Sequence, residues 1–174
     1  MQKSQASIGI LAFVGGLLLT NSAHSEIINV PADQPTIQAG IDAASNGDEV
    51  IVAPGTYLET INLLGKAVTL RSSDGPEVTM IDAENAGTVV TCASGEGVAT
   101  VIEGFTITAG SSNAGSGMFI ENSSPTVTNC AFVDNTASEF GGGVYANNAA
   151  PHFTDCAFIS RHGERERSPS GIVT

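Results

Sequence analysis

The sequence predicts an all-β protein, a parallel β-helix in which the chain turns once per repeat, with a short helix closing its N-terminal end. Three observations lead to this fold class. The second half of the chain contains an internal repeat, apolar residues alternate over short stretches, and the composition favours strands. Glycine accounts for 20 of the 174 residues, while aromatic residues make up 5% of the chain and charged residues 14%. Such a composition is typical of short strands joined by tight turns.

The repeat aligns residues 117–134 with residues 143–160 at an offset of 26, and seven of the 18 positions are identical. A parallel β-helix would stack each matched side chain on its counterpart in the next turn. The pairs expected to stack inside are Cys130/Cys156 and Phe132/Phe158, and Asn122/Asn148 would form an amide ladder at a turn. A weaker copy at offset 25 places Ile102, Phe105 and Ile107 beneath Val127, Cys130 and Phe132. A leucine-rich repeat of similar length would show a Leu and Asn spacing that is absent here, and propeller blades would need about 40–50 residues.

Period-two alternation of apolar residues indicates strands with one buried face. It is clearest in residues 101–107 and 127–132. Similar segments recur upstream at Val50–Ala53, Thr60–Leu63, Val68–Arg71, Val78–Ile81 and Thr88–Cys92. Residues 49–160 are therefore expected to form about five coils of the β-helix, at roughly 20–26 residues a coil.

The first 25 residues have the pattern of a secretory signal peptide. Lys3 precedes twelve residues without a polar side chain, Ile8–Leu19, and small residues at Ala23 and Ser25 stand before Glu26. This order of charged, apolar and small residues predicts cleavage before Glu26. The apolar run is too short to span a bilayer. We therefore expect a secreted protein, extracellular or periplasmic in a bacterium, with no membrane span after cleavage.

Residues 26–48 are expected to cap the first coil. A strand over Glu26–Val30 comes first, and Thr36–Ala44 then places Ile37, Gly40/Ile41 and Ala44 on one face of a helix, which ends at Asn46-Gly47-Asp48. The open end of a β-helix exposes a hydrophobic cross-section, and a short amphipathic helix would cover it.

The run from Pro31 to Tyr57 (PADQPTIQAGIDAASNGDEVIVAPGTY) resembles the N-terminal cap of secreted right-handed β-helix proteins with a pectin-lyase-like fold. The segments Gly104–Ile107 and Asn129–Phe132 are similar to the coil repeats of that superfamily. The resemblance covers about Ile27 to Ser160 and implies a right-handed coil. It also implies activities that range from lyases, hydrolases and esterases acting on acidic polysaccharides to non-catalytic surface and adhesion proteins. Because one architecture hosts many activities, the resemblance specifies fold better than function.

The charge balance excludes nucleic acid as a partner. The chain carries a formal net charge of −12, and between Glu26 and Ser160 only Lys66 and Arg71 are basic against 16 acidic residues, a formal −14. Such a body cannot neutralise phosphates. It also repels polyuronates unless cations bridge the like charges, which favours neutral glycans, protein partners or calcium-mediated contact.

No catalytic residue can be assigned. Lyases of the resembled superfamily use an Arg or Lys as base. In the mature chain expected after cleavage, Lys66 and Arg71 are the only candidates outside the last 14 residues. Arg71 precedes a turn, Ser72–Gly75, and is most simply a solvated arginine. Glycoside hydrolysis needs two carboxylates about 5–9.5 Å apart, which the sequence alone does not locate. His162-Gly163 matches one element of polygalacturonase-like sets but lacks its partners.

No cofactor is expected, with calcium as an open alternative. Calcium takes six to eight oxygen ligands. Glu121, Asp134-Asn135, Glu139 and Asp155 could offer some, but no Asp-x-Asp spacing or calcium-binding nonapeptide accompanies them. Gly141–Gly143 is expected to be a turn entering a strand rather than a phosphate loop, and His152 to be a surface strand position.

The three cysteines, Cys92, Cys130 and Cys156, cannot all pair within one chain. Adjacent coils would bring Cys130 and Cys156 within bridging distance, so a disulfide is sterically conceivable. Reduced, buried thiols that behave as small hydrophobes are the favoured alternative. Three separated cysteines do not form a zinc cluster.

The repeat pattern stops after Ser160. Residues 161–174 contain three of the six basic residues, and no third copy of the repeat begins there. We expect a flexible tail of foreign composition and infer a truncation or frameshift of a longer reading frame near Ser160.

Three functions follow as alternatives. The leading one is a non-catalytic secreted module that presents a strand face to glycans or cell-surface partners. The second is a fragment of a polysaccharide lyase or hydrolase, and the third is a structural stalk of an adhesin. The sequence does not indicate an oligomeric state.

Overall fold

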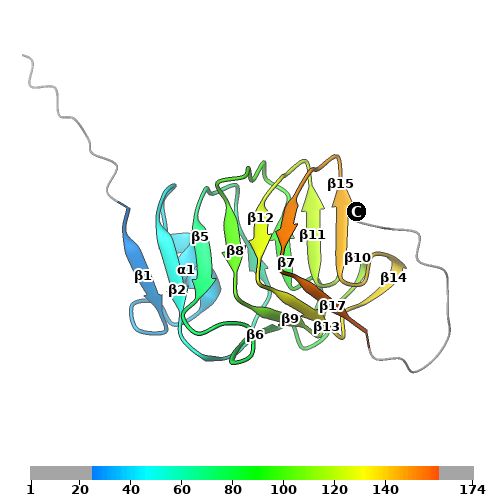
Figure 1. The fold of residues 1–174 in the computed structure, drawn as a ribbon, viewed down its shortest axis with the longest axis horizontal. Coiled ribbons are helices and arrows are strands. Elements are labelled where there is room, and N and C mark those ends of the chain that lie inside the picture. The colour runs from blue at the N-terminus through cyan, green and yellow to red at the C-terminus, as the bar shows by residue number, and fades with distance from the viewer. Residues whose placement is uncertain (1–24, 161–174) are drawn as a thin grey trace, which may run out of the picture.

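The computed structural model describes residues 25–160 as a parallel β-solenoid of about five turns (Figure 1). The cleavable leader expected at residues 1–25 and the tail expected at residues 161–174 lie outside the described residues, Ser25 excepted. The right-handed sense of the coil stays a prediction.

Three parallel sheets form the walls of the solenoid. Sheet A has six strands: β1 (Ile27–Val30), β2 (Glu49–Val52), β5 (Thr69–Ser72), β8 (Val101–Glu103), β12 (Thr126–Thr128) and β16 (His152–Thr154). Sheet B has five: β3 (Gly55–Leu58), β6 (Thr79–Asp82), β9 (Thr106–Thr108), β13 (Ala131–Val133) and β17 (Ala157–Ile159). Sheet C has four: β4 (Ile61–Asn62), β7 (Val90–Cys92), β11 (Met118–Glu121) and β15 (Val144–Asn147).

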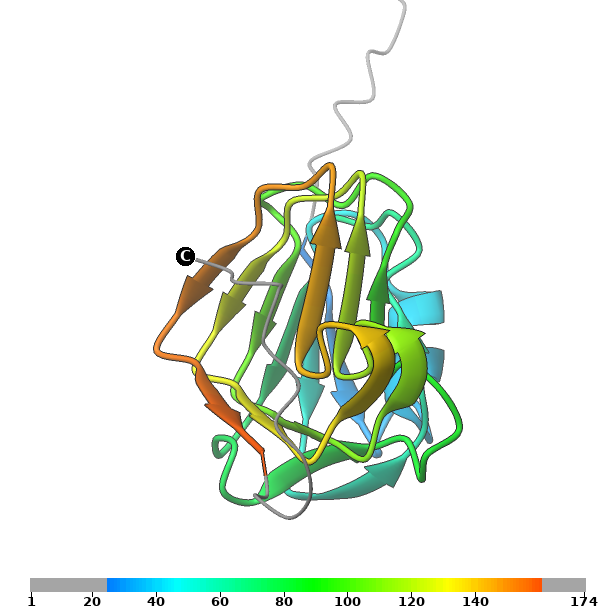
Figure 2. The same ribbon diagram turned by 90° about the vertical axis from the view of Figure 1, so that its right-hand side faces the viewer.

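A fourth, two-stranded sheet lies outside these walls. β10 (Ser111–Ala114) pairs with β14 (Thr136–Phe140), and we call this pair the flange. Viewed along the axis from the C-terminal end, the flange curls beside the foot of β11 and β15 (Figure 2). The alternation pattern did not predict the flange, because its strands are mostly polar and exposed.

The register confirms the repeat. Phe132 pairs with Phe158 at an offset of 26 and with Ile107 at an offset of 25. The Phe132 and Phe158 rings stack with centroids 4.9 Å apart and an interplanar angle of 6°. At the turn after sheet C, the side-chain amide of Asn148 donates to Asn122 Oδ1 over 2.5 Å, so the amide ladder also forms.

The two segments with the clearest alternation are each split into two strands. Residues 101–107 divide into β8 and β9, and residues 127–132 fall in β12 and β13. The corner between the strands has a positive φ, 79° at Gly104 and 50° at Asn129. The corner shifts the period-two alternation by one residue. The buried side chains on its two sides are three positions apart, Ile102 and Phe105 in one turn and Val127 and Cys130 in the next, and all of them face the same core.

The capping helix forms where the sequence predicts it. α1 (Ile37–Ala43) begins after Thr36, whose hydroxyl accepts a hydrogen bond from Ala39 N over 3.1 Å. Ile37 and Ile41 are fully buried. The helix packs against β1, β2 and β4, and it therefore covers the core at the N-terminal end of the solenoid.

Two side chains from the first coil hold the ends of α1. The Glu59 carboxylate accepts hydrogen bonds from the backbone N–H groups of Ile37 and Gln38 over 2.8 and 2.9 Å. The Lys66 ammonium donates to the carbonyl oxygens of Ile41, Asp42 and Ala44 over 2.7–2.9 Å. A negative group at the N-terminus and a positive group at the C-terminus both complement the helix dipole.

Candidate functional site

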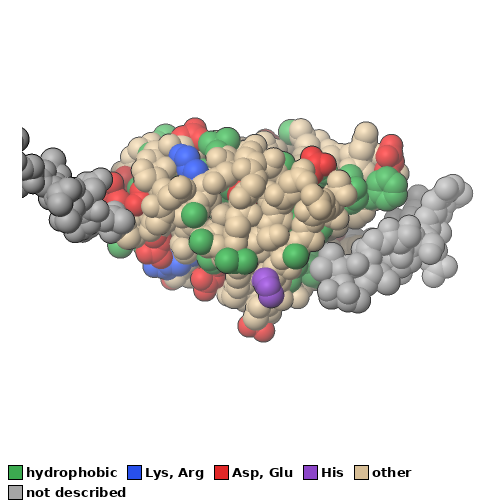
Figure 3. All heavy atoms as spheres, turned by 90° about the horizontal axis from the view of Figure 1, so that it is seen from above, with side chains coloured by type: hydrophobic (Ala, Val, Ile, Leu, Met, Phe, Trp, Pro, Cys, Tyr) green, Lys and Arg blue, Asp and Glu red, His purple; other side chains and the backbone are tan. Residues whose placement is uncertain are grey.

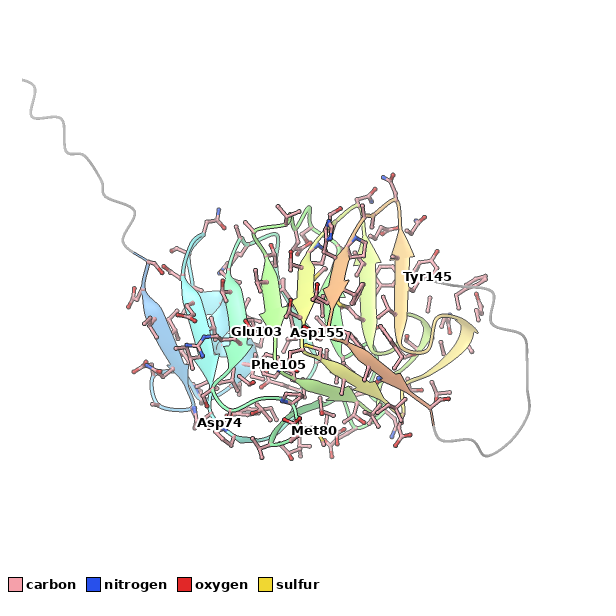
Figure 4. All side chains as sticks on the ribbon, in the orientation of Figure 1. Asp74, Met80, Glu103, Phe105, Tyr145 and Asp155 are labelled. Carbon is pink, nitrogen blue, oxygen red and sulfur yellow. The ribbon has the colours of Figure 1, made fainter. Side chains whose placement is uncertain are left out.

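The outer face of sheet C carries aromatic residues. In β11 the side chains of Met118 and Ile120 are buried, so Phe119 and Glu121 point outward. The same alternation in β15 buries Val144 and turns Tyr145 to the outer face, at the C-terminal end of the molecule (Figure 4).

Register and ring geometry join these aromatic side chains into one cluster. Phe119 pairs with Tyr145 across β11 and β15, and their ring centroids lie 5.6 Å apart with an interplanar angle of 20°. Phe140, at the end of β14, lies 6.1 Å from the Tyr145 ring at 37° and is 49% exposed. We call Phe119, Phe140 and Tyr145 the aromatic cluster. It lies where the flange meets sheet C.

Polar groups continue the outer face around the aromatic cluster. Thr91 stands beside Phe119 in the register, and Asn62 stands beside Thr91. Two residues further along the strands that carry Phe119 and Tyr145, the Asn147 amide donates to Glu121 Oε1 over 3.3 Å. The face therefore combines ring surface with hydroxyl, amide and carboxylate groups.

A glycine makes room for this arrangement. Gly115 follows the flange strand β10 with a φ of +59°, and a Cβ at this position would lie 3.0 Å from Tyr145 Cβ and 2.6 Å from the Met118 carbonyl oxygen. No larger residue could let the flange approach sheet C this closely.

The two basic residues of the described chain are both held in structural contacts. Lys66 binds the last carbonyl groups of α1. Arg71 forms an ion pair with Glu49 of the neighbouring strand of sheet A, so it is not the solvated turn arginine expected from the sequence. On the face shown in Figure 3, basic side chains lie toward the N-terminal end, while hydrophobic side chains are scattered over the face. His162-Gly163 lies outside the described residues.

The acidic residues considered for calcium do not converge. Among residues 25–160, no three His, Cys, Asp or Glu side chains lie close enough together to hold a metal ion. Glu121 contacts Asn147, Glu139 is exposed on the flange, and Asp155 is exposed in the corner between β16 and β17. Asn135, next to Asp134, accepts from Gly110 N and donates to the Ile107 carbonyl, both over 2.9 Å. His152 is exposed on β16, as expected.

The three cysteines are free thiols, which agrees with the reduced state favoured from the sequence. Burial raises the pKa of the Cys130 thiol to about 12 and raises the pKa of Cys92 further. Burial also raises the pKa of Cys156, which is only partly buried. None of the three has the lowered pKa of a reactive thiolate.

The buried carboxylate of Glu96, which no sequence pattern predicts, joins three turns of the solenoid. Glu96 is 2% exposed and accepts hydrogen bonds from Gly65 N, Ser94 N and Ser123 Oγ over 2.7–2.9 Å. Burial acts to raise the pKa of Glu96, but the hydrogen bonds outweigh it and lower the pKa below its ordinary value. The contacts satisfy the carboxylate, so Glu96 stabilises the fold rather than forming a reactive group.

Comparison with protein-family models, with curated proteins and with solved structures found no match to this chain. In the described part of the chain, no helix is long and apolar enough to cross a membrane.

Proposed function

We propose that this chain is a non-catalytic β-solenoid module that binds a neutral glycan on the outer face of sheet C. The observation that carries the proposal is the aromatic cluster. Aromatic rings that point outward from a solenoid wall offer an apolar surface for the C–H face of a sugar ring, and adjacent amide, hydroxyl and carboxylate groups can bond to sugar hydroxyls.

The charge of the protein favours a neutral ligand. Between Glu26 and Ser160 the formal charge is −14. The two basic residues in this range, Lys66 and Arg71, are both engaged in contacts within the N-terminal coils. A polyuronate would therefore meet repulsion without a compensating cation from the described residues. The same two contacts give no support to the lyase alternative, which needs a free basic side chain.

The place of action belongs to the proposal as well. The signal-peptide pattern of the first 25 residues and the resemblance to secreted pectin-lyase-like β-helix proteins both support export to the periplasm or the medium. There the module would present its face to cell-surface or free polysaccharide.

A glycan array with calcium and with chelator tests the proposal. We expect binding to neutral glycans that does not depend on calcium. Tyr145→Ala should weaken it at least tenfold, whereas Tyr145→Phe should retain it because the ring remains. Leu58→Ala is the matched control, because Leu58 is 61% exposed on sheet B, away from the cluster. Absence of binding, or equal binding by Tyr145→Ala, would overturn the proposal.

Fluorescence offers a direct readout of the cluster. The chain has two tyrosines and no tryptophan, so Tyr57→Phe leaves Tyr145 as the single tyrosine reporter. Tyr57 lies away from the cluster, where its hydroxyl donates to the Ala53 carbonyl over 2.9 Å. Titration of this variant with a glycan that scores on the array should change the Tyr145 emission.

A further inference from the structure

The two ends of the solenoid differ in how the core is covered. At the N-terminal end, α1 packs over the first strands, and Ile37 and Ile41 are fully buried. At the other end, β15, β16 and β17 are each the last strand of their sheet among the described residues. Figure 2 looks onto this end, with the last coil nearest the viewer.

The side chains of the last coil are more exposed than those at the matched positions of the preceding coil. Phe132 is 2% exposed, whereas Phe158, one turn later, is 53% exposed. The same step takes Val127, fully buried, to Phe153, partly exposed, and Cys130, buried, to Cys156, partly exposed. Within residues 25–160, the side chains of the last coil therefore have no following turn to cover them as their equivalents in the preceding coil do.

The backbone of the last coil is open as well. Ala157 N donates back to the Cys130 carbonyl, and the Ile159 carbonyl accepts from Asp134 N. Because alternate peptide groups of a strand point to opposite edges, those of Phe158 point to the open edge. The described residues provide no strand to receive them.

Proteins usually protect such edges with charged residues or proline inside the strands. β15 (VYAN), β16 (HFT) and β17 (AFI) contain no Asp, Glu, Lys, Arg or Pro. In residues 144–160 Asp155 is the single acidic residue, although the body as a whole is strongly acidic. The last coil is thus the part of this acidic protein that a second copy can approach with little electrostatic repulsion.

We propose that two copies of this chain associate through their last coils, C-terminal end to C-terminal end, to form a closed dimer. Head-to-tail stacking is blocked, because α1 covers the N-terminal end to which the last coil would otherwise add. The self-complementary arrangement is a two-fold one, which sets edge strands of the two copies antiparallel and packs Phe153 and Phe158 against the partner's end.

Light scattering and analytical ultracentrifugation across roughly 1–100 μM test the dimer. The sample is the full chain, purified in the form that the expressing cells export. We expect a mass of twice the monomer. Phe158→Asp should shift the protein to monomer, with a dissociation constant raised at least thirtyfold, as for a central interface residue. Leu58→Asp is the matched control, because Leu58 is a similarly exposed apolar residue at the N-terminal end of the same sheet, and it should stay dimeric.

Circular dichroism checks that each variant folds. If Phe158→Asp does not fold, Phe158→Ser replaces it, because serine adds no charge. Hydrogen exchange of the wild type should slow at the amides of Phe153 and Phe158 as the dimer forms. A monomer throughout the concentration range overturns the proposal, and slow exchange at these amides in such a monomer would assign the cover to residues 161–174. Loss of the dimer in Leu58→Asp, or open-ended oligomers, would overturn it too.

Discussion

Replacement of Lys66 by methionine should destabilise the protein more than any other change of a single basic residue in the described chain. The ammonium group donates three hydrogen bonds to the Ile41, Asp42 and Ala44 carbonyls at the C-terminus of α1. A hydrogen bond to a charged group contributes about 1.5–3 kcal/mol. A cation at a helix C-terminus adds about 0.3–1 kcal/mol.

The three bonds share one partly exposed ammonium, and water replaces some of them in the variant. We therefore expect Lys66→Met to lower the free energy of unfolding by about 2–3 kcal/mol, well below the sum of three separate bonds. For a chain of this length, that corresponds to a fall in Tm of about 4–12 °C. The aliphatic part of the side chain is retained in methionine, so packing changes little.

Urea denaturation measures the difference, since a shift of the midpoint at constant slope reports a change in stability. Arg71→Met is the control. Its ion pair with Glu49 is partly exposed, with 34% of the arginine side chain accessible, so its loss should cost less than about 1 kcal/mol. If Lys66→Met costs less than about 0.5 kcal/mol, or no more than Arg71→Met, the helix-capping role is wrong. Hydrogen exchange should also quicken at the α1 amides in Lys66→Met and not in Arg71→Met.

Three further outcomes follow from the described contacts. Because hydrogen bonds lower the pKa of Glu96 in the folded state, its contribution to stability is present above its unfolded pKa and is lost as the pH falls through the folded value. Glu96→Gln should thus be less stable at neutral pH and lose less on acidification, as acid titration of the urea midpoint would reveal. Gly110→Ala should lower the free energy of unfolding by more than about 2 kcal/mol, because the added Cβ would lie 2.0 Å from a backbone oxygen. Gly97→Ala is the control: it has open space around it, and thermal melts should show a change of less than about 1 kcal/mol. A thiol reagent should modify Cys156 in the native monomer and all three thiols after unfolding. Rapid native reaction of Cys130 would contradict its burial.

The stacking of the coils could be predicted because the repeat carries it locally. Identical residues at a constant offset specify register without knowledge of the rest of the fold, and Phe132/Phe158 and Asn122/Asn148 pair as expected. The capping helix was predictable for a similar reason, since its apolar face and its N-cap residue lie within a few residues of one another.

Contacts between residues that are not at matched positions of a repeat could not be predicted. Glu96 and Gly65 are 31 residues apart, and Lys66 and Ile41 are 25 apart, with no common motif. The outward aromatic cluster was missed for a different reason. Met118, Phe119 and Ile120 are all apolar, so alternation does not reveal which of them faces out. Only the buried neighbours in the assembled sheet decide that Phe119 points to solvent.

The distribution of charge connects the fold to the proposed binding face. The described part of the chain has two basic side chains, and the N-terminal coils use both, one to cap α1 and the other to pair with Glu49. A ligand on sheet C therefore meets no cation from the described residues, whose contribution to affinity must come from ring surface and hydrogen bonds. Such a site should bind a neutral glycan with little dependence on ionic strength, because salt weakens only interactions between charges and a neutral ligand makes none. A strong loss of glycan binding between low and high salt would place the ligand elsewhere on the molecule.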